Sequence, residues 1–457
     1  MDLMQIKELM DRDFTPGHPV TIQSWIGSLV LVGLLTGLHH PPGIAQSAPG
    51  PTTAQPKLPP SQNTPIRSDV KPFPSNPLEL TSPDPLLPEG ATKRPLTVAE
   101  RTQLIAALQE LDAQADARLK AGDRTGAFDL WHRVLRLSRW LGPVDEVKAL
   151  GQIGAIAWQE SDTSELRWIT QRLDVLLAQA NAPLVPGFGN NINLGQGNVV
   201  SRTNLLEALG LAYQQVRVPQ SAIGVYEQIL TEAKQRKDQT RVEATLNTLG
   251  EMELAWFEYP AAAAAYRELV TMAQTQNDQA RQQVYLQKLS FLFEQAKQPD
   301  QAVIYQQQLI DLYQQIPDPK PIPGLRLKMG DNYQKLSQLA LAERSYQEAY
   351  QLAQTLQQFG YASDALQKLG RLYRDNNRTD AAIKVYRFLV AVEQQAYNYY
   401  GLMTAYDQLG QLYLDRKAYD QALVAFRQGL QLATRLKHRE PYFSEQIQRV
   451  TEASTTQ

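Results

Sequence analysis

Three lysine residues recur at one spacing in the C-terminal half of the chain. Lys288, Lys328 and Lys368 are separated by 40 residues each time. If the three lysines occupied the same place in successive structural units, their ammonium groups would form a row of hydrogen-bond donors. Such a row could bind backbone carbonyls or acidic side chains of an extended peptide. The alternative is that the lysines are solvated charges, paired with neighbours such as Asp331 and Asp364.

Catalytic chemistry has few candidates in this sequence. Three of the five histidines precede residue 41, and neither His132 nor His438 has a paired carboxylate or a second histidine at metal-binding spacing. The chain has no phosphate-binding loop, nucleophile elbow or His-Glu-x-x-His motif. In "GFGNNINLGQG" (187–197), Ile192 replaces the third glycine of a dinucleotide fingerprint and no strand-helix context is expected, which favours a flexible insertion. We therefore predict no enzyme, no catalytic residues, no cofactor and no metal.

Composition narrows the function classes further. The chain has 457 residues, a net charge of -2 and no cysteine. A charge so close to neutral argues against a dedicated nucleic-acid binder, because such proteins carry clustered Lys and Arg. The absence of cysteine excludes disulfides, thiol catalysis and Cys-ligated zinc, and it suits an oxidising compartment.

The elements that would position the lysines follow from an internal repeat. A large apolar residue followed by a small one recurs every 40 residues, at Leu209-Gly210, Leu249-Gly250, Leu289-Ser290, Met329-Gly330, Leu369-Gly370 and Leu409-Gly410. An aromatic residue stands three positions after the small one, except at Glu253. Alanine stands twelve positions after it, followed four residues later by Tyr or Phe, except at Gln306. These spacings indicate two helices per unit, whose apolar faces become buried only when units stack. The small residue would let a neighbouring helix approach closely.

Leu-Gly-x-x-Tyr followed by Ala-x-x-x-Tyr/Phe resembles the tetratricopeptide repeat (TPR), and "LGQLYLDRKAYDQALVAF" (409–426) is the nearest copy. The units are longer than the usual length of about 34 residues, so the resemblance is to a 40-residue variant. It implies an all-α, right-handed superhelical solenoid of about eight antiparallel helix pairs behind a disordered N-terminal region. We place the solenoid at 96–457, with an insertion at 182–199 and a C-terminal capping helix at 441–453.

In this family the first helix of each unit lines a concave groove. Four positions of that helix are expected to face the groove: three before, two before, one after and four after the small residue. The resemblance therefore predicts a partner-binding surface made of Asn247, Gln287, Lys288, Lys328, Asp331, Gln367, Lys368, Arg371, Asp407 and Gln411. The family's carboxylate clamp, which grips a C-terminal carboxylate, is not reproduced in these rows.

The first 95 residues differ from the rest of the chain. The uncharged run "WIGSLVLVGLLTGL" (25–38) suits the core of a signal peptide and is short for a membrane span of about 20 residues. We assign residues 1–47 to a signal peptide or a membrane anchor. The anchor alternative would use residues 20–38. Before the apolar run, acidic residues outnumber basic ones, whereas a signal peptide normally begins with a positively charged region. Residues 48–95 are expected to be a Pro-rich disordered linker, because 15 of the 28 prolines lie within 41–95.

The sequence thus predicts a non-catalytic protein–protein interaction scaffold that binds a peptide or protein segment in the TPR groove. We expect the chain to be exported, periplasmic or extracellular, and to resemble exported bacterial TPR proteins of cyanobacterial type. The partner is a protein or peptide and not a nucleic acid, and membrane contact is expected only through an N-terminal anchor. A membrane-tethered assembly factor and a self-associating structural array are the alternatives, and an enzyme-associated module ranks below both.

Overall fold

The computed structural model describes residues 75–80, 84–88, 91, 94–182, 191–193, 199–315 and 318–455. Residues 76–457 form one compact unit. The predicted signal or anchor segment 1–47 lies outside the described residues. Among those that are described, no helix has the length and hydrophobicity that are needed to cross a membrane.

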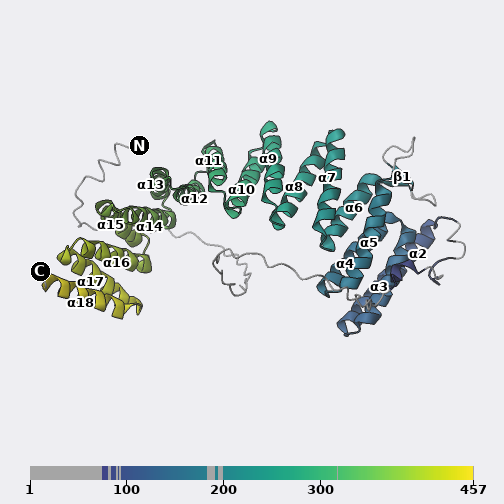
Figure 1. Cartoon of the computed structure of the whole chain (residues 1–457), viewed down its shortest axis with the longest axis horizontal. Coiled ribbons are helices and arrows are strands. Elements are labelled where there is room, and N and C mark those ends of the chain that lie inside the picture. The colour runs from purple at the N-terminus through teal and green to yellow at the C-terminus, as the bar shows by residue number, and fades with distance from the viewer. Residues whose placement is uncertain are drawn as a thin grey trace, which may run out of the picture. The chain divides into compact units, whose positions relative to one another are not determined.

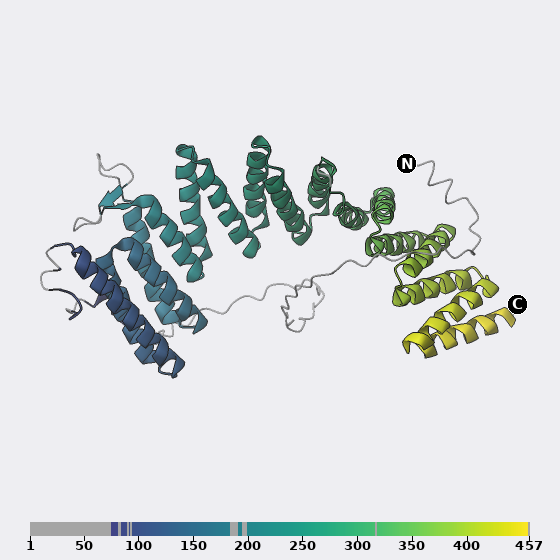
Figure 2. The ribbon, with the colours of Figure 1, turned by 180° about the vertical axis from the view of Figure 1, so that it is seen from behind.

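The fold is an all-α solenoid of helix pairs, as predicted (Figure 1). The first helices of the eight pairs are α2 (Val98–Lys120), α4 (Pro143–Gln159), α6 (Arg202–Gln215), α8 (Gln239–Ala255), α10 (Gln279–Gln295), α12 (Ile322–Lys335), α14 (Phe359–Asp375) and α16 (Tyr399–Asp415). The second helices are α3 (Arg124–Ser138), α5 (Thr163–Ala180), α7 (Pro219–Gln235), α9 (Tyr259–Thr275), α11 (Pro299–Gln315), α13 (Leu339–Thr355), α15 (Thr379–Gln395) and α17 (Tyr419–Leu436). The last helix, α18 (Glu440–Thr455), packs against α17. Figure 2 shows from behind that neighbours along the chain are also neighbours in space.

The 40-residue period consists of two similar halves of 20 residues. Most helices from α7 onward have 17 residues, and most of the described turns between helices contain a non-glycine residue with positive φ. These residues recur every 20 positions from Arg217 to Lys297 and again from Ser337 to Lys437, at Arg217, Lys237, Phe257, Asn277, Lys297, Ser337, Gln357, Asn377, Tyr397, Lys417 and Lys437. The next residue closes the helix end, as where Val218 N donates to Tyr213 O at 2.9 Å. This is the hydrogen bond of a Schellman motif, which ends a helix with a left-handed residue.

Aromatic side chains of the second helices pack onto the small residues of the first helices. A Cβ on any of five glycines would lie within 3.0 Å of a ring atom, in the pairs Gly210–Tyr226, Gly250–Tyr266, Gly330–Tyr346, Gly370–Tyr386 and Gly410–Phe426. The group that approaches each glycine is therefore the aromatic ring of its own helix pair. Where Ser290 replaces glycine, Gln306 replaces the ring. Gln306 is fully buried and bonds Glu294 and Asn332 at 2.8 and 3.2 Å.

The predicted disordered linker extends too far towards the first helix pair. A short 3-10 helix, η1 (Pro77–Glu79), packs on α3, and its Leu78 is 1% exposed within the hydrophobic core. The Arg133 guanidinium donates to both carboxylate oxygens of Asp84 at 2.7 and 2.8 Å. This bidentate ion pair lowers the pKa of Asp84. Single side chains, Leu78 and Asp84, therefore anchor parts of this segment to the first helix pair. Isolated contacts of this kind leave no periodic pattern in the sequence from which they could be predicted.

A small hairpin precedes α6, contrary to the expectation that no strand and helix surround the glycine-rich stretch. Strands β1 (Asn191–Asn193) and β2 (Val199–Ser201) pair antiparallel, with Ile192 opposite Val200. Helix α6 begins at the next residue, Arg202. The β-branched pair at 199–200 favours a strand locally. The remainder of the predicted insertion lies outside the described residues.

Candidate protein-interaction groove

Each lysine of the predicted row has a carboxylate neighbour on the preceding helix pair. The ion pairs are Lys288–Glu251 at 3.5 Å, Lys328–Glu294 at 3.3 Å and Lys368–Asp331 at 2.8 Å. Tyr346 also donates its hydroxyl to Asp331 at 2.8 Å. The ammonium groups are therefore compensated by charges of the chain itself, which is the alternative that the spacing left open.

The predicted amide residues mostly link neighbouring helices. Asn247 Nδ2 donates to the Tyr285 hydroxyl at 3.1 Å, and Gln287 Nε2 donates to the Tyr313 hydroxyl at 3.0 Å. Gln367 instead bonds within its own helix, to Ser363 Oγ at 3.1 Å. These side chains hold the surface together, and their amides are already engaged.

The remaining predicted residues have different environments. Asp407 is buried and accepts from Arg439 at 3.0 Å and from the Tyr442 hydroxyl at 2.7 Å. Gln411 Nε2 also donates to the Tyr442 hydroxyl, at 3.2 Å, so both residues join α16 to α18. Arg371 is exposed and forms no ion pair with any residue that the structure describes. The ten predicted residues therefore share a helix face but do not converge on one cavity.

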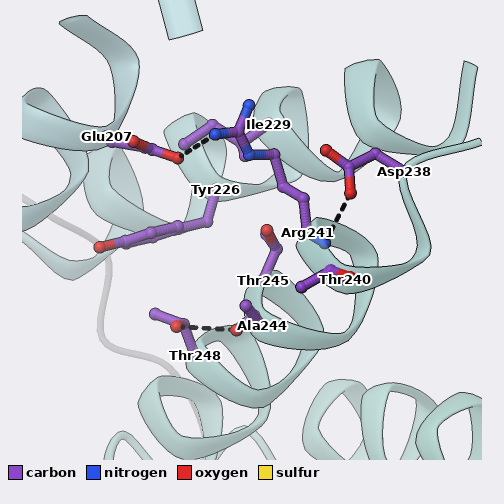
Figure 3. Close-up of a pocket in the computed structure, with 9 residues that line it drawn as sticks. All are labelled: Glu207, Tyr226, Ile229, Asp238, Thr240, Arg241, Ala244, Thr245 and Thr248. Carbon is purple, nitrogen blue, oxygen red and sulfur yellow. Dashed lines mark hydrogen bonds and ion pairs between the residues drawn. The ribbon is translucent and has the colours of Figure 1, made fainter. Parts of the chain in front are cut away.

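Two adjoining cavities open between α6, α7 and α8, and we call them together the Tyr226 groove. Their volumes are about 370 and 450 Å³, and Tyr226 and Thr248 line both. The smaller cavity is also lined by Glu207 of α6, Ile229 of α7 and several residues of α8, which Figure 3 shows converging from three helices. The larger cavity is completed by Gln214, Arg217, Pro219, Glu251, Met252, Ala255 and Trp256.

The groove lies at a helix pair whose tyrosine is more exposed than its equivalents in later pairs. Tyr226 is only partly buried, whereas the equivalent Tyr266, Tyr346 and Tyr386 are at most 2% exposed. On α8, Thr248 stands at the position that the later units give to Lys288, Lys328 and Lys368. Threonine is shorter than the lysine or glutamine at the equivalent later positions and so covers less of the neighbouring surface. This break in the lysine row was the sequence signal for the groove, and sequence reasoning missed it.

The charges in the smaller cavity are arranged around Arg241. Its guanidinium forms an ion pair with Glu207 at 3.1 Å, and its backbone N–H donates to Asp238 at 3.1 Å (Figure 3). Burial and then the Glu207 charge raise the pKa of Tyr226, so its phenol stays protonated at neutral pH. The phenol can therefore donate a hydrogen bond to a bound carbonyl or carboxylate oxygen.

The larger cavity combines an apolar wall with a polar rim. Pro219, Met252 and Trp256 supply apolar surface, and Trp256 is 46% exposed. At the rim, Arg217 is exposed and has no ion-pair partner within the described part of the chain. A half-exposed tryptophan beside a cavity is typical of a surface that receives an apolar side chain from a partner.

His132 has a carboxylate partner, and the prediction that it stands alone is wrong. Its Nε2 lies 2.7 Å from Glu165 Oε2, which joins α3 to α5 across 33 residues of sequence. The Trp168 ring packs edge-on against the imidazole with a centroid distance of 6.0 Å. His132 and Glu165 are only 7% and 6% exposed, so we assign this pair to the core.

Comparisons with known proteins agree with the repeat pattern. One family model described as tetratricopeptide repeat matches residues 205–240 and 365–395, and a second such model matches residues 404–435. No curated protein matches the chain. Solved structures that align with parts of the chain include BtubC (BKLC) from P. vanneervenii, with 17% identity and a TM-score of 0.34. That alignment covers 48% of this chain and 92% of BtubC. The MamA protein has 18% identity, coverages of 42% and 92%, and a TM-score of 0.31. A signal transduction ATPase with a tetratricopeptide repeat sensor from Pyrococcus horikoshii has 12% identity, coverages of 78% and 52%, and a TM-score of 0.35.

Proposed function

We propose that this chain, which is a tetratricopeptide repeat protein and a protein–protein interaction scaffold, binds an extended segment of a protein partner in the Tyr226 groove. The observation that carries the proposal is the pair of adjoining cavities that share Tyr226 and Thr248. Proteins recognise an extended segment through pockets that receive its side chains. Two neighbouring cavities can therefore receive two side chains of one segment. The groove needs no catalytic group for this role.

The lysine row is a weaker candidate for the same role. Each of its ammonium groups would have to leave a carboxylate of the chain before it could bind a partner, and exchanging one ion pair for another brings little net gain. In the Tyr226 groove, by contrast, Trp256 is 46% exposed and Arg217 forms no ion pair among the described residues. We therefore place the principal contact at α6, α7 and α8.

Thr248→Lys tests this placement with a change that the repeat itself tolerates. Lysine occupies the equivalent position in three other units, so the fold should persist while the new side chain enters the space beside Tyr226 that the two cavities share. Gln408→Lys is the matched control, since it makes the corresponding change in the α16 unit. Peptides selected from a displayed random library by the full wild-type chain should be retained by Gln408→Lys and lost by Thr248→Lys. Equal retention by both variants would place binding elsewhere.

We further propose that the scaffold acts outside the cytoplasm. Support comes from the apolar run 25–38 and from the absence of cysteine in a chain of 457 residues. N-terminal sequencing of the protein from its native cell distinguishes two export routes. A mature chain that begins shortly after residue 47 means a cleaved signal peptide, and an intact 25–38 segment in a membrane fraction means an anchor. An intact segment in the cytoplasmic fraction would contradict export.

A further inference from the structure

Three positions on two neighbouring helix pairs carry glutamate, and the equivalent positions of the later pairs carry no acidic residue. Glu253 stands where other units have Tyr213, Phe293, Tyr333, Tyr373 and Tyr413. Glu258 stands where they have Val218, Gln298, Gln338, Arg378 and Ala418. On the preceding second helix, Glu227 stands where later units have Arg267, Gln307, Gln347 and Arg387. We call Glu227, Glu253 and Glu258 the glutamate triad.

The centre of the triad is a buried carboxylate without a partner. Glu253 is 7% exposed, and its Oε2 accepts no hydrogen bond from any residue that the structure describes. Glu227 and Glu258 are exposed, and neither forms an ion pair within the described residues. Burial, followed by the charges of Glu227 and Glu258, raises the pKa of Glu253 to about 7. On α9, the hydroxyl of Tyr266 also lacks a hydrogen-bond partner among the described residues, and burial, followed by the charges of Glu251 and Glu253, raises the pKa of Tyr266 to about 12.

The α14 pair shows how the same region is neutralised elsewhere. There Tyr373 donates its hydroxyl to Glu343 at 2.6 Å, and Arg378 forms an ion pair with Glu343 at 2.5 Å. The Arg378 guanidinium also lies 4.3 Å from the centroid of the Tyr373 ring. Arg378 is the counterpart of Glu258, so the α14 unit supplies its own cation at a position where the α8 unit has an acid.

We propose that the glutamate triad binds a Lys or Arg side chain of the partner segment that occupies the Tyr226 groove. This inference rests on the proposed function and adds the chemistry of the partner. None of the three glutamates lines a cavity itself, but Glu227 and Glu253 are sequence neighbours of the lining residues Tyr226 and Met252, and Glu258 lies two residues after Trp256. We therefore place the triad next to the groove. The partner is thus a segment with a basic residue close to an apolar residue that enters the larger cavity.

An organic cation fits the triad better than a metal ion does. No group of three or more metal-binding side chains in the described residues has the arrangement of a metal site. A guanidinium has five N–H donors and can bond several carboxylates at once. Because a bound cation favours the ionised form of Glu253, its affinity should increase as pH rises through about 7.

The test compares two small probes that differ mainly in charge. Nα-acetylarginine amide and its neutral isostere Nα-acetylcitrulline amide are titrated into the full chain labelled with ¹³C at glutamate carboxyls. The Glu253 signal is assigned by its loss in Glu253→Gln. We expect the arginine derivative to shift this signal and lower the pKa of Glu253, and the citrulline derivative to leave both unchanged. Equal effects of the two probes, or no effect of arginine at saturation, would overturn the inference.

A matched pair of triple variants separates the triad from net charge. In Glu227→Gln/Glu253→Gln/Glu258→Gln we expect arginine affinity, read from the backbone amide signals around the groove, to fall by roughly tenfold or more. Asp364→Asn/Asp415→Asn/Glu445→Gln removes three exposed carboxylates that have no ion pair in the described residues, and it should keep the wild-type affinity. An equal loss in both variants would mean that arginine responds only to overall charge.

The two proposals can fail separately. Selected peptides that carry no enrichment in Lys or Arg, yet are released by Thr248→Lys, would leave the groove function standing and overturn the role of the triad. If arginine binding depends on the triad but peptide binding is unchanged by Thr248→Lys, the groove function is overturned instead.

Discussion

Tyr386 lies against Gly370 so closely that a Cβ on the glycine would stand 2.7 Å from Cζ of the ring. A glycine inside a helix costs roughly 1 kcal/mol relative to alanine. The ring that Gly370 admits is 2% exposed, and burial of a large aromatic side chain offsets that cost. The glycine in the middle of α14 is therefore a packing requirement of the helix pair.

Gly370→Ala should lower the free energy of unfolding by about 1–3 kcal/mol, because the new methyl group displaces the Tyr386 ring in a packed core. Gly224→Ala is the control, since a Cβ there meets no atom within 4 Å. It should raise stability by up to about 1 kcal/mol through helix propensity alone. Thermal unfolding of the two variants measures the difference, and a Gly370→Ala protein as stable as Gly224→Ala would contradict the packing argument.

The left-handed turn residues are a source of strain that can be removed. Lys297 has a φ of 55°, a conformation that glycine adopts without steric cost. We therefore expect Lys297→Gly to stabilise the protein by up to about 1 kcal/mol. Ala296→Gly, at a neighbouring φ of -68°, should destabilise it instead. If chemical denaturation showed that both variants change the free energy of unfolding in the same direction, the left-handed turn geometry would not limit stability.

Glu253 should make stability depend on pH. Its folded pKa of about 7 lies above the usual 4.5, so the protonated form is the one that the fold favours. The resulting stabilisation is fully present below pH 4.5 and is lost as pH rises through about 7, a change of roughly 3 kcal/mol. Glu253→Gln should abolish this decline, and Glu258→Gln should retain most of it. Urea denaturation at several pH values measures how the free energy of unfolding of each variant changes with pH. An unchanged pH dependence in Glu253→Gln would mean that another group titrates.

Leu78 should stabilise the first helix pair, although it lies outside every α-helix. Leu78→Ala removes a side chain that is 1% exposed, whereas Leu80→Ala changes one that is 56% exposed. The first substitution should cost about 2 kcal/mol or more, and the second close to nothing. Hydrogen exchange of α2 and α3 locates the effect. Equal exchange in both variants would show that the segment 76–88 does not stabilise the array.

The helices could be predicted because their signals are periodic. The recurrence of Leu-Gly and of Ala-x-x-x-Tyr identifies the faces that must be buried, and burial of those faces dictates stacking. Leu78 and Asp84 escaped prediction because each acts as a single anchor inside a proline-rich stretch. Glu165 escaped because its contact with His132 depends on how α3 and α5 pack, which no local pattern encodes.

The helix face that carries the candidate site could be predicted from the sequence, but the repeat units in which the site lies could not. Thr248 and Glu251 lie on the helix face that the resemblance indicated, but the regular lysines drew attention to other units. Those lysines are paired with carboxylates, and the opening lies where the row is interrupted. The sites that we propose therefore lie at departures from the repeat pattern, Thr248 and Glu253, and not at its consensus positions.

The most direct test of the account is the affinity of one peptide, selected by the wild-type chain, for the Thr248→Lys and Gln408→Lys variants by calorimetry. If the partner occupies the Tyr226 groove, Thr248→Lys should weaken binding by roughly tenfold or more, because the lysine stem fills the space shared by the cavities. Gln408→Lys should bind as the wild type does. Wild-type affinity in Thr248→Lys, with an unchanged melting temperature, would contradict the central claim.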